Sequence, residues 1–275
     1  MKNSHIAFIG GGNMAASLIG GLLETDVAAD HIHVADVAPE PVAARYPVNL
    51  YKNNADAAKQ ADVIVLAVKP QQMGEVAKGL KSTLENRDAM PLFISIAAGI
   101  RLCDLYAWLG SPTVPAVRVM PNTPALVQTG ASGLYADVHV SATQREMAES
   151  ILQAVGITAW VEREDLLDTV TALSGSGPAY FFLVMEVMQK AAEQLGLSAN
   201  EARQLTLQTA LGAAKMALNS EDDPATLRAN VTSKGGTTER ALEVMQAGGI
   251  EQLFLDALSA AKDRSVSLAE ELGEN

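Results

Sequence analysis

Up to residue 161, short hydrophobic runs alternate with segments of helical periodicity. The run at 62–68 is nearly continuous and rich in β-branched residues, which is typical of a central strand buried on both faces. Strand–helix alternation at this spacing predicts parallel βαβ units with helices on both faces of one sheet. The predicted strands are residues 6–9, 32–35, 48–51, 62–68, 92–97, 116–120, 133–135 and 158–161, and the predicted helices include 13–23, 102–109 and 141–154.

After residue 161 the strand-like alternation stops and helical patterns take over. Helix starts are predicted at Pro178, at the capping box of Ser198 and Glu201, and at Pro224. A long last helix is predicted at 250–272. We therefore expect an α/β domain at 1–162 followed by an all-helical domain at 163–275.

The helix that starts at Pro178 is apolar almost all round, because residues 180–185 are all aromatic or aliphatic. A helix of this kind belongs in a core or in a subunit interface. A helical domain of roughly 110 residues has too little interior to bury it. We therefore expect an obligate homodimer formed through the helical domain.

Composition narrows the class of protein. The chain has 275 residues, 48% of them hydrophobic, and a net charge of −12, which argues against a nucleic-acid partner. The single cysteine, Cys103, excludes an internal disulfide framework and is interpreted as a small buried hydrophobe in a reducing cytoplasm. We predict no membrane span and no signal peptide, and therefore a cytoplasmic protein.

A glycine-rich motif follows the first predicted strand. Gly10, Gly12 and Ala15 fit the pattern G-x-G-x-x-A between a strand and a helix, which predicts a doubly wound, Rossmann-type sheet that binds a dinucleotide. Asp36 ends the second strand, where an acid accepts hydrogen bonds from the adenosine ribose. The alternative is a glycine-rich turn beside a surface aspartate. The predicted cofactor-binding residues of this region are Ile9, Gly10, Gly11, Gly12, Asn13, Met14 and Asp36.

Other predicted strand ends should line the same crevice, because ligands of such sheets bind at the carboxyl ends of the strands. Lys69 is expected near the phosphates or in solvent, and Asn54 at the ribose or at a helix cap. The further predicted cofactor-binding residues are Asn54, Ala67, Val68, Lys69, Pro70, Ala97, Ala98 and Asn122. Residues 36–40 hold no base, so Asp36 favours NADH over NADPH while leaving both open.

Residues 230–238 place hydroxyl groups and paired glycines between two helical patterns. Backbone N–H groups at a helix start favour a small anion, glycines allow close approach, and Ser or Thr hydroxyls orient a ligand. A plain helix–helix connection remains the alternative. No metal site is predicted, because His31 and His33 share a strand face without a third ligand. No nucleophile elbow occurs either, so the chemistry is expected to come from a nicotinamide.

The chain resembles the Δ1-pyrroline-5-carboxylate reductase family in five ordered motifs. They are residues 8–14, 67–70, 120–124, 173–180 and 224–242, and the last contains the loop 230–238. The resemblance implies a Rossmann domain at 1–162, a helical domain that interleaves with a partner's, and in some members a decamer of five dimers. It further implies reduction of a cyclic imine to proline with NADPH or NADH.

The resemblance also implies site residues. Thr238 matches the family's near-invariant threonine and would hydrogen-bond the imine nitrogen, as the catalytic residue. Asn230 and Glu164 are weaker matches, and Glu164 has the alternative of an acid at a helix start. The remaining substrate-binding candidates, expected around the substrate carboxylate, are Ser233, Gly235, Gly236 and Thr237.

Two kinds of rival remain. A β-hydroxyacid dehydrogenase or a related imine reductase would share the two-domain layout. The hydroxyacid enzymes resemble one another in a lysine shortly past a glycine pair, and residues 178–182 hold no lysine. The second rival is a dinucleotide sensor without catalysis, in which the loop 230–238 is only a connection.

Overall fold

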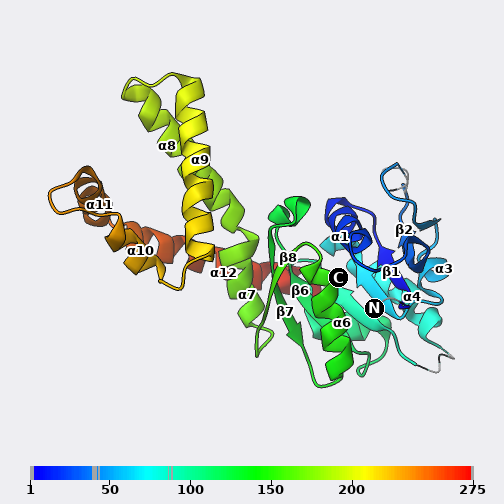
Figure 1. Ribbon diagram of the computed structural model, residues 1–275. Coiled ribbons are helices and arrows are strands. Elements are labelled where there is room, and N and C mark those ends of the chain that lie inside the picture. The colour runs from blue at the N-terminus through cyan, green and yellow to red at the C-terminus, as the bar shows by residue number, and fades with distance from the viewer. Residues whose placement is uncertain (1–2, 39–41, 43, 86, 88, 274–275) are drawn as a thin grey trace. The chain divides into compact units, whose positions relative to one another are not determined.

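One eight-stranded sheet organises the N-terminal part of the chain (Figure 1). The computed structural model describes residues 3–38, 42, 44–85, 87 and 89–273. The strand order is β3-β2-β1-β4-β5-β6-β7-β8, and all neighbouring pairs are parallel except β6–β7. The strands are β1 (Ile6–Ile9), β2 (Ile32–Ala35), β3 (Asn49–Tyr51), β4 (Val63–Leu66), β5 (Leu92–Ser95), β6 (Ala116–Met120), β7 (Gly130–Ala136) and β8 (Gly156–Trp160).

The doubly wound α/β prediction is confirmed, with one correction at β7. Because only a 3-10 turn, η3 (Thr123–Val127), separates β6 from β7, the chain has no crossover helix there and returns antiparallel. Helices α1 (Asn13–Leu23) and α6 (Ala142–Gln153) contribute to the core on one face of the sheet.

The opposite face has its own hydrophobic core. Three helices between successive strands cover it, and their apolar stripes are buried there. They are α3 (Asn54–Ala58), α4 (Met73–Leu84) and α5 (Leu102–Leu109), and two further 3-10 turns are η1 (Ala29–His31) and η2 (Pro70–Gln72). Leu272, from the last helix of the chain, joins this second core.

The chain forms two compact units. The first runs to Ser176 and takes in the chain again from Ala260, and the second is Gly177–Ser259. The last helix, α12 (Ile250–Gly273), therefore contributes to both units. The sequence-based domain boundary after residue 162 stays a prediction.

The helix predicted from Pro178 belongs to a longer helical run. It begins with α7 (Leu166–Val170), passes through a π-helical turn, η4 (Thr171–Gly175), and continues as α8 (Gly177–Gln194). The sequence analysis missed α7 and η4 because the glycines at 175 and 177 break the helical pattern. Gly175 packs closely on Met120, since a Cβ there would displace the terminal methyl group of the Met120 side chain.

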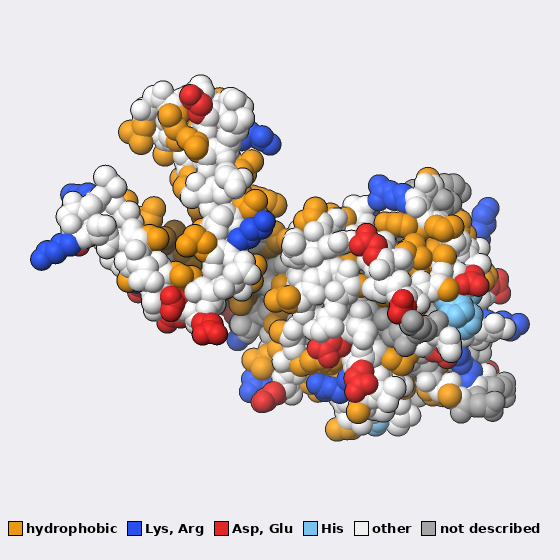
Figure 2. Space-filling model, in the orientation of Figure 1, with side chains coloured by type: hydrophobic (Ala, Val, Ile, Leu, Met, Phe, Trp, Pro, Cys, Tyr) orange, Lys and Arg blue, Asp and Glu red, His pale blue; other side chains and the backbone are white. Residues whose placement is uncertain are grey.

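The second unit is built from helices whose large apolar side chains are mostly exposed. Phe181, Phe182 and Leu183 on α8 are 66%, 64% and 59% exposed. Figure 2 shows hydrophobic side chains along α8 and α9. The other helices are α9 (Ala199–Leu218), α10 (Pro224–Asn230) and α11 (Thr237–Ala247), and the capping box of Ser198 and Glu201 is confirmed at the start of α9.

One helical run among the described residues, Leu166–Gln194, is long and apolar enough to cross a membrane by length and composition alone. Only 11% of its most apolar window is buried within the chain. The sequence analysis missed this run because it did not join α7 to α8. A helix face of this kind also suits a subunit interface.

Candidate active site

Three consecutive glycines form the turn between β1 and α1, and each has a different environment. Gly10 has a φ of 102°, and a Cβ there would lie 2.7 Å from the Ala67 carbonyl oxygen, so only glycine fits. Gly12 is the N-cap of α1, and no described atom lies within 4 Å of a Cβ built on it. The turn therefore presents the start of α1 to open space, where an anionic group can approach the backbone.

A cavity of about 910 Å³ opens in front of this turn. It lies at the carboxyl ends of β1, β2, β3 and β4, where the strand order reverses between β1 and β4. Such a switch point is where doubly wound sheets bind nucleotides. Of the predicted cofactor-binding residues, the structure brings together Gly10, Gly12, Asp36, Asn54, Ala67, Val68 and Lys69 around this cavity.

The remaining predicted cofactor-binding residues do not line the cavity; they are Ile9, Gly11, Asn13, Met14, Pro70, Ala97, Ala98 and Asn122. Ala97 is buried in the second core. The Asn122 amide is held inside the fold, since it donates to the Ser174 carbonyl at 3.1 Å and accepts from Ala131 N–H at 2.8 Å. Lys52, Asn53 and Gln72 line the cavity but were missed by the sequence analysis.

The Asp36 carboxylate holds the glycine turn in place. One of its oxygens accepts from Gly11 N–H at 2.6 Å, and the other accepts from Ala38 N–H at 2.8 Å. Each carboxylate oxygen has a further lone pair that can accept a ribose hydroxyl. Of the stretch 36–40 that the sequence analysis examined for bases, residues 39 and 40 lie outside the described residues.

The helix after β3 is capped by Asn53, whose side chain accepts from Ala55 N–H at 2.8 Å. The sequence analysis considered Asn54 for this cap, and that alternative was wrong by one residue. Asn54 is the first residue of α3 and lines the cavity. Its placement there leaves the predicted contact with the ribose available.

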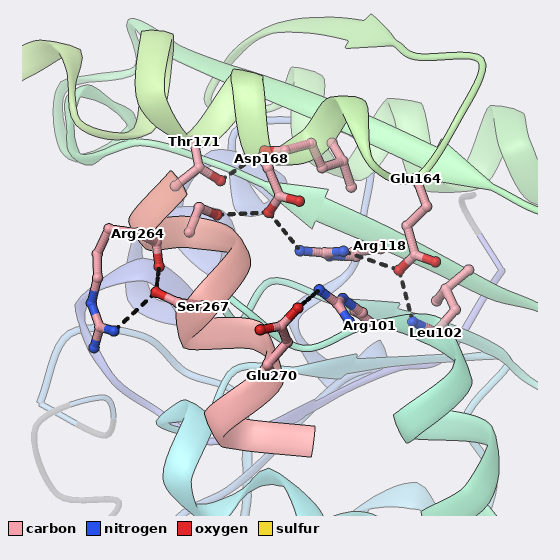
Figure 3. Close-up of polar contacts among 11 residues, drawn as sticks. Arg101, Leu102, Arg118, Glu164, Asp168, Thr171, Arg264, Ser267 and Glu270 are labelled. Carbon is pink, nitrogen blue, oxygen red and sulfur yellow. Dashed lines mark hydrogen bonds and ion pairs between the residues drawn. The ribbon is translucent and has the colours of Figure 1, made fainter. Parts of the chain in front are cut away.

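Glu164 belongs to a network of polar side chains around Arg118, which is only 4% exposed (Figure 3). The Glu164 carboxylate accepts from Arg118 at 3.1 Å and from Leu102 N–H, at the start of α5, at 2.8 Å. Asp168 lies 3.9 Å from the same guanidinium and accepts from the Ser265 hydroxyl at 2.7 Å.

The alternative for Glu164 in the sequence analysis was an acid at a helix start. Glu164 does accept a hydrogen bond from a helix start, but that helix is α5 rather than α7, which follows Glu164 in the chain. Sequence reasoning missed Arg118, Asp168 and Ser265. A signal existed for two of them, because Arg118 interrupts an apolar strand and Asp168 lies in an apolar helical stretch. Buried charges require partners, which could have flagged both residues.

The loop 230–238 connects α10 to α11 in the second unit, and α11 begins at Thr237, as the helical patterns indicated. Gly235 has a φ of 75°, and its N–H donates to the Glu239 carboxylate at 2.6 Å. Gly236 N–H donates to the Ser233 carbonyl at 2.9 Å.

Helix α11 has Gly236 as its N-cap, so among the described residues no side chain forms a capping hydrogen bond at its start. The N–H groups of Thr237 and Thr238 lie in the first helical turn, so they have no helical partner. Among the predicted substrate-binding residues, the N–H groups of Thr237 and Thr238 are therefore open to an anion, whereas those of Gly235 and Gly236 are already used. Glu239 is an additional loop residue that the sequence analysis did not single out.

The arrangement of the histidine side chains corrects the sequence analysis, which expected no third histidine beside His31 and His33. His5 Nδ1 lies 3.0 Å from His33 Nε2, and the rings of His5 and His31 are 4.5 Å apart. His31 lies in η1 rather than in a strand. Among the described residues, no group of three or more His, Cys, Asp or Glu has the geometry to hold a metal ion.

Cys103 is exposed, which corrects the expectation of a buried side chain. Partial burial of the thiol, followed by the carboxylates of Asp104 and Glu164, raises its pKa. A raised pKa keeps the thiol protonated, and the thiol is a poor nucleophile. The interpretation that Cys103 is not a nucleophile is therefore supported by its surroundings rather than by burial in a core.

Two family models match parts of the chain. One, described as pyrroline-5-carboxylate reductase dimerisation, matches residues 164–268. The other, described as NADP oxidoreductase coenzyme F420-dependent, matches residues 5–99. The second match covers the glycine turn and the strand ends that line the cavity, and the first covers the loop 230–238.

Relatives and solved structures extend this similarity over the whole chain. A pyrroline-5-carboxylate reductase from Pseudomonas aeruginosa is 53% identical, with 100% of both chains covered. One from Haemophilus influenzae is 47% identical over 96% of this chain and 97% of the relative.

A solved pyrroline-5-carboxylate reductase from Coxiella burnetii has a TM-score of 0.90 at 44% identity, covering 96% of this chain and 98% of its own. The Plasmodium falciparum enzyme, solved with NADP bound, has a TM-score of 0.85 at 28% identity, and the match covers 98% of this chain and 99% of the Plasmodium chain. The likeness therefore holds for sequence and for fold.

Proposed function

The chain belongs to the pyrroline-5-carboxylate reductase family, and from that premise we propose which of its residues carry out the reduction. It is an NAD(P)H-dependent oxidoreductase of proline biosynthesis that acts on a small cyclic imine. The nicotinamide supplies hydride to the imine carbon, which yields L-proline. The residues of the chain must hold the cofactor, hold the substrate carboxylate, and orient the imine nitrogen.

The cofactor is proposed to bind in the cavity at the β1–β4 switch point. The open start of α1 at Gly12 fits a pyrophosphate, because no described side chain fills the space in front of it. Asp36 holds the glycine turn by its bond to Gly11 N–H and faces the cavity, where it would accept the adenosine ribose. Lys69 lines the cavity at the end of β4 and would lie beside the phosphates.

The substrate carboxylate is proposed to bind at the start of α11. The N–H groups of Thr237 and Thr238, together with the positive end of the helix dipole, favour an anion there. The Ser233 hydroxyl would add a directional hydrogen bond. The further candidates Asn230, Gly235 and Gly236 would shape this loop rather than donate to the substrate, since both glycine N–H groups are already bonded.

Thr238 is proposed as the residue that hydrogen-bonds the ring nitrogen. A threonine hydroxyl is too weak an acid to protonate an imine alone, so water or a substrate that is already protonated must supply the proton. The protonated iminium accepts hydride far better than the neutral imine. The main contribution of Thr238 is therefore orientation of the ring.

The observation that carries this assignment is the helix start of α11, which is left without a side-chain cap. The experiment is to follow NADH and NADPH absorbance with Δ1-pyrroline-5-carboxylate and, in parallel, with a β-hydroxyacid and NAD(P)⁺. We expect oxidation of the reduced coenzyme with the imine only. Turnover of the hydroxyacid alone would instead support a dehydrogenase, and binding of coenzyme without turnover would support a sensor.

The assembly is proposed to be a homodimer formed through the helical unit, in the cytoplasm and without a membrane. The exposed apolar side chains of α8 and the match to the family's dimerisation model support a subunit interface for the run 166–194. A decamer of five dimers is the larger alternative. Light scattering decides between them, since the chain mass is 28.9 kDa and a dimer has twice that mass.

A further inference from the structure

A carboxylate and an ammonium group, from the residues that follow two paired strands, line the proposed cofactor cavity. Ala35 and Tyr51 are partners in the parallel register of β2 and β3, and Asp36 N–H donates to the Tyr51 carbonyl at 3.3 Å. Asp36 directly follows β2, and Lys52 directly follows β3. Both line the cavity, and neighbouring strands lie only about 4.8 Å apart, so the two side chains start close together.

Asp36 and Lys52 are held very differently. Both Asp36 oxygens accept backbone N–H groups, which fixes the carboxylate against the glycine turn. Lys52 is exposed and forms no ion pair within the part of the chain that the structure describes. Its ammonium group is therefore available to an anion that enters this end of the cavity.

Resting on the proposed function, we propose that Lys52 binds the 2′-phosphate that distinguishes NADPH from NADH, and that the chain therefore binds both coenzymes. An acid at the end of β2 marks the place of the adenosine ribose, and the 2′-phosphate is attached to that ribose. Lys52 directly follows β3, the strand that pairs with β2, just as Asp36 directly follows β2. It is thus the cavity lysine nearest to the expected position of this phosphate.

The other basic residues fit this role less well. Lys69 follows β4, which lies on the far side of β1 from β2, and this places Lys69 nearer the pyrophosphate. Arg45, the base that sequence alone suggested as nearest to Asp36, does not line the cavity. A sequence search limited to the residues after β2 misses Lys52, because it reaches the ribose from the neighbouring strand.

Asp36 and Lys52 together predict only a small difference between the affinities for NADPH and NADH. Asp36 accepts the 2′-hydroxyl of NADH but repels a 2′-phosphate, whereas Lys52 attracts the phosphate and contributes little to the hydroxyl. The two effects oppose each other for NADPH. Because the contact with Lys52 is between exposed charges, affinity for NADPH should fall more steeply with salt than affinity for NADH.

The test compares Lys52→Gln with wild type and with Lys59→Gln, a matched control at an exposed lysine just past α3 and outside the cavity. Dissociation constants are measured by titration calorimetry for NADPH and NADH, and for the fragments 2′,5′-ADP and 5′-AMP. We expect Lys52→Gln to weaken NADPH and 2′,5′-ADP by roughly tenfold or more, with NADH and 5′-AMP within about twofold of wild type. Lys59→Gln should change none of them.

Three results would overturn the proposal. They are unchanged NADPH affinity in Lys52→Gln, an equal loss for NADPH and NADH, and a wild-type protein that binds NADH alone. The last of these leaves the reductase function intact, because imine reduction with NADH would persist. A wild type that binds neither coenzyme would instead overturn the proposed function together with this inference.

Discussion

Thr238 is the second residue of α11 and is partly exposed at the open start of that helix. Replacing it with alanine keeps the helix and its N–H groups but removes the hydroxyl. We expect Thr238→Ala to lower turnover by roughly tenfold or more, because a lost positioning contact misorients the imine. Binding of NAD(P)H, measured by fluorescence, should persist.

The matched control is Thr226→Ala, at an exposed threonine on α10. It should keep full turnover. Equal turnover of Thr238→Ala and wild type would remove Thr238 from the mechanism.

His33 is a single residue whose surroundings make stability depend on pH. Partial burial, followed by the neighbouring imidazoles of His5 and His31, lowers its pKa below 6.5, while Asp30 opposes the shift. The folded chain therefore keeps His33 neutral at a pH where the unfolded chain takes up a proton. The free energy of unfolding should fall as pH falls below 6.5, and His33 should contribute no pH dependence above it.

The measurement is urea unfolding of wild type and His33→Gln between about pH 7.5 and about pH 5.5. The variant should lose less stability on acidification, since its side chain does not titrate. Asp62, which accepts from His5 N–H, and Tyr51, 3.1 Å from His33 Nδ1, face the cluster in both proteins. An identical pH dependence in the two proteins would show that His33 is not the group responsible.

At the residue scale, the sequence indicated which residues lie near one another better than which atoms they bond to. Gly10, Gly12 and Asp36 were predicted together from their residue types and spacing, and all three line one cavity, while their contacts with a cofactor stay a prediction. That Asp36 also ties down Gly11, or that Asn53 rather than Asn54 caps α3, depends on backbone angles that spacing does not encode. Lys52 was missed because its nearness to Asp36 arises only when β2 and β3 pair.

At the scale of the element, the end of α12 is joined to residues that are distant in the sequence. Ser265, 6% exposed, donates to Asp168 of α7, which also faces the Arg118 guanidinium of β6. Removing that donor leaves a buried carboxylate with fewer partners. We expect Ser265→Ala to lower the free energy of unfolding by about 1–3 kcal/mol, measured by urea denaturation.

Ser267→Ala, on the same helix, is the control, because its hydroxyl bonds only with Arg264 of its own helix among the contacts described. It should unfold close to wild type. If both variants unfold at the same urea concentration, the bond between Ser265 and Asp168 contributes nothing measurable.

Elements with local signals were predicted closely. The helix 13–23 and the strand 32–35 match α1 and β2, and the capping box predicted at Ser198 and Glu201 is present at the start of α9. Elements set by tertiary contacts were not. The π-helical turn at 171–175 contacts Met120 at the end of β6 and Asn122 in the loop after it, and the antiparallel pairing of β7 follows from a short connection.

At the scale of the whole molecule, the exposed apolar side chains of α8 indicate a surface that binds a second subunit. A charge at Phe181, which is 66% exposed within one chain, would be buried in the proposed dimer. We expect Phe181→Glu to shift the protein toward monomers, measured by light scattering at several concentrations.

Gln194→Glu places the same charge at an exposed polar position near the end of α8 and should leave the mass unchanged. A Phe181→Glu protein that stays fully oligomeric would move the interface elsewhere.

The return of α12 to the first unit also bears on synthesis. Gly99, with a φ of 77°, packs against Leu268 and Leu272, and Gly273 lies against Asp104, so the end of α12 packs on the turn after β5. A ribosome adds this end of α12 only after all eight strands of the sheet and the whole of the second unit. The first unit therefore cannot complete its second core, which includes Leu272, until long after its last strand has been made.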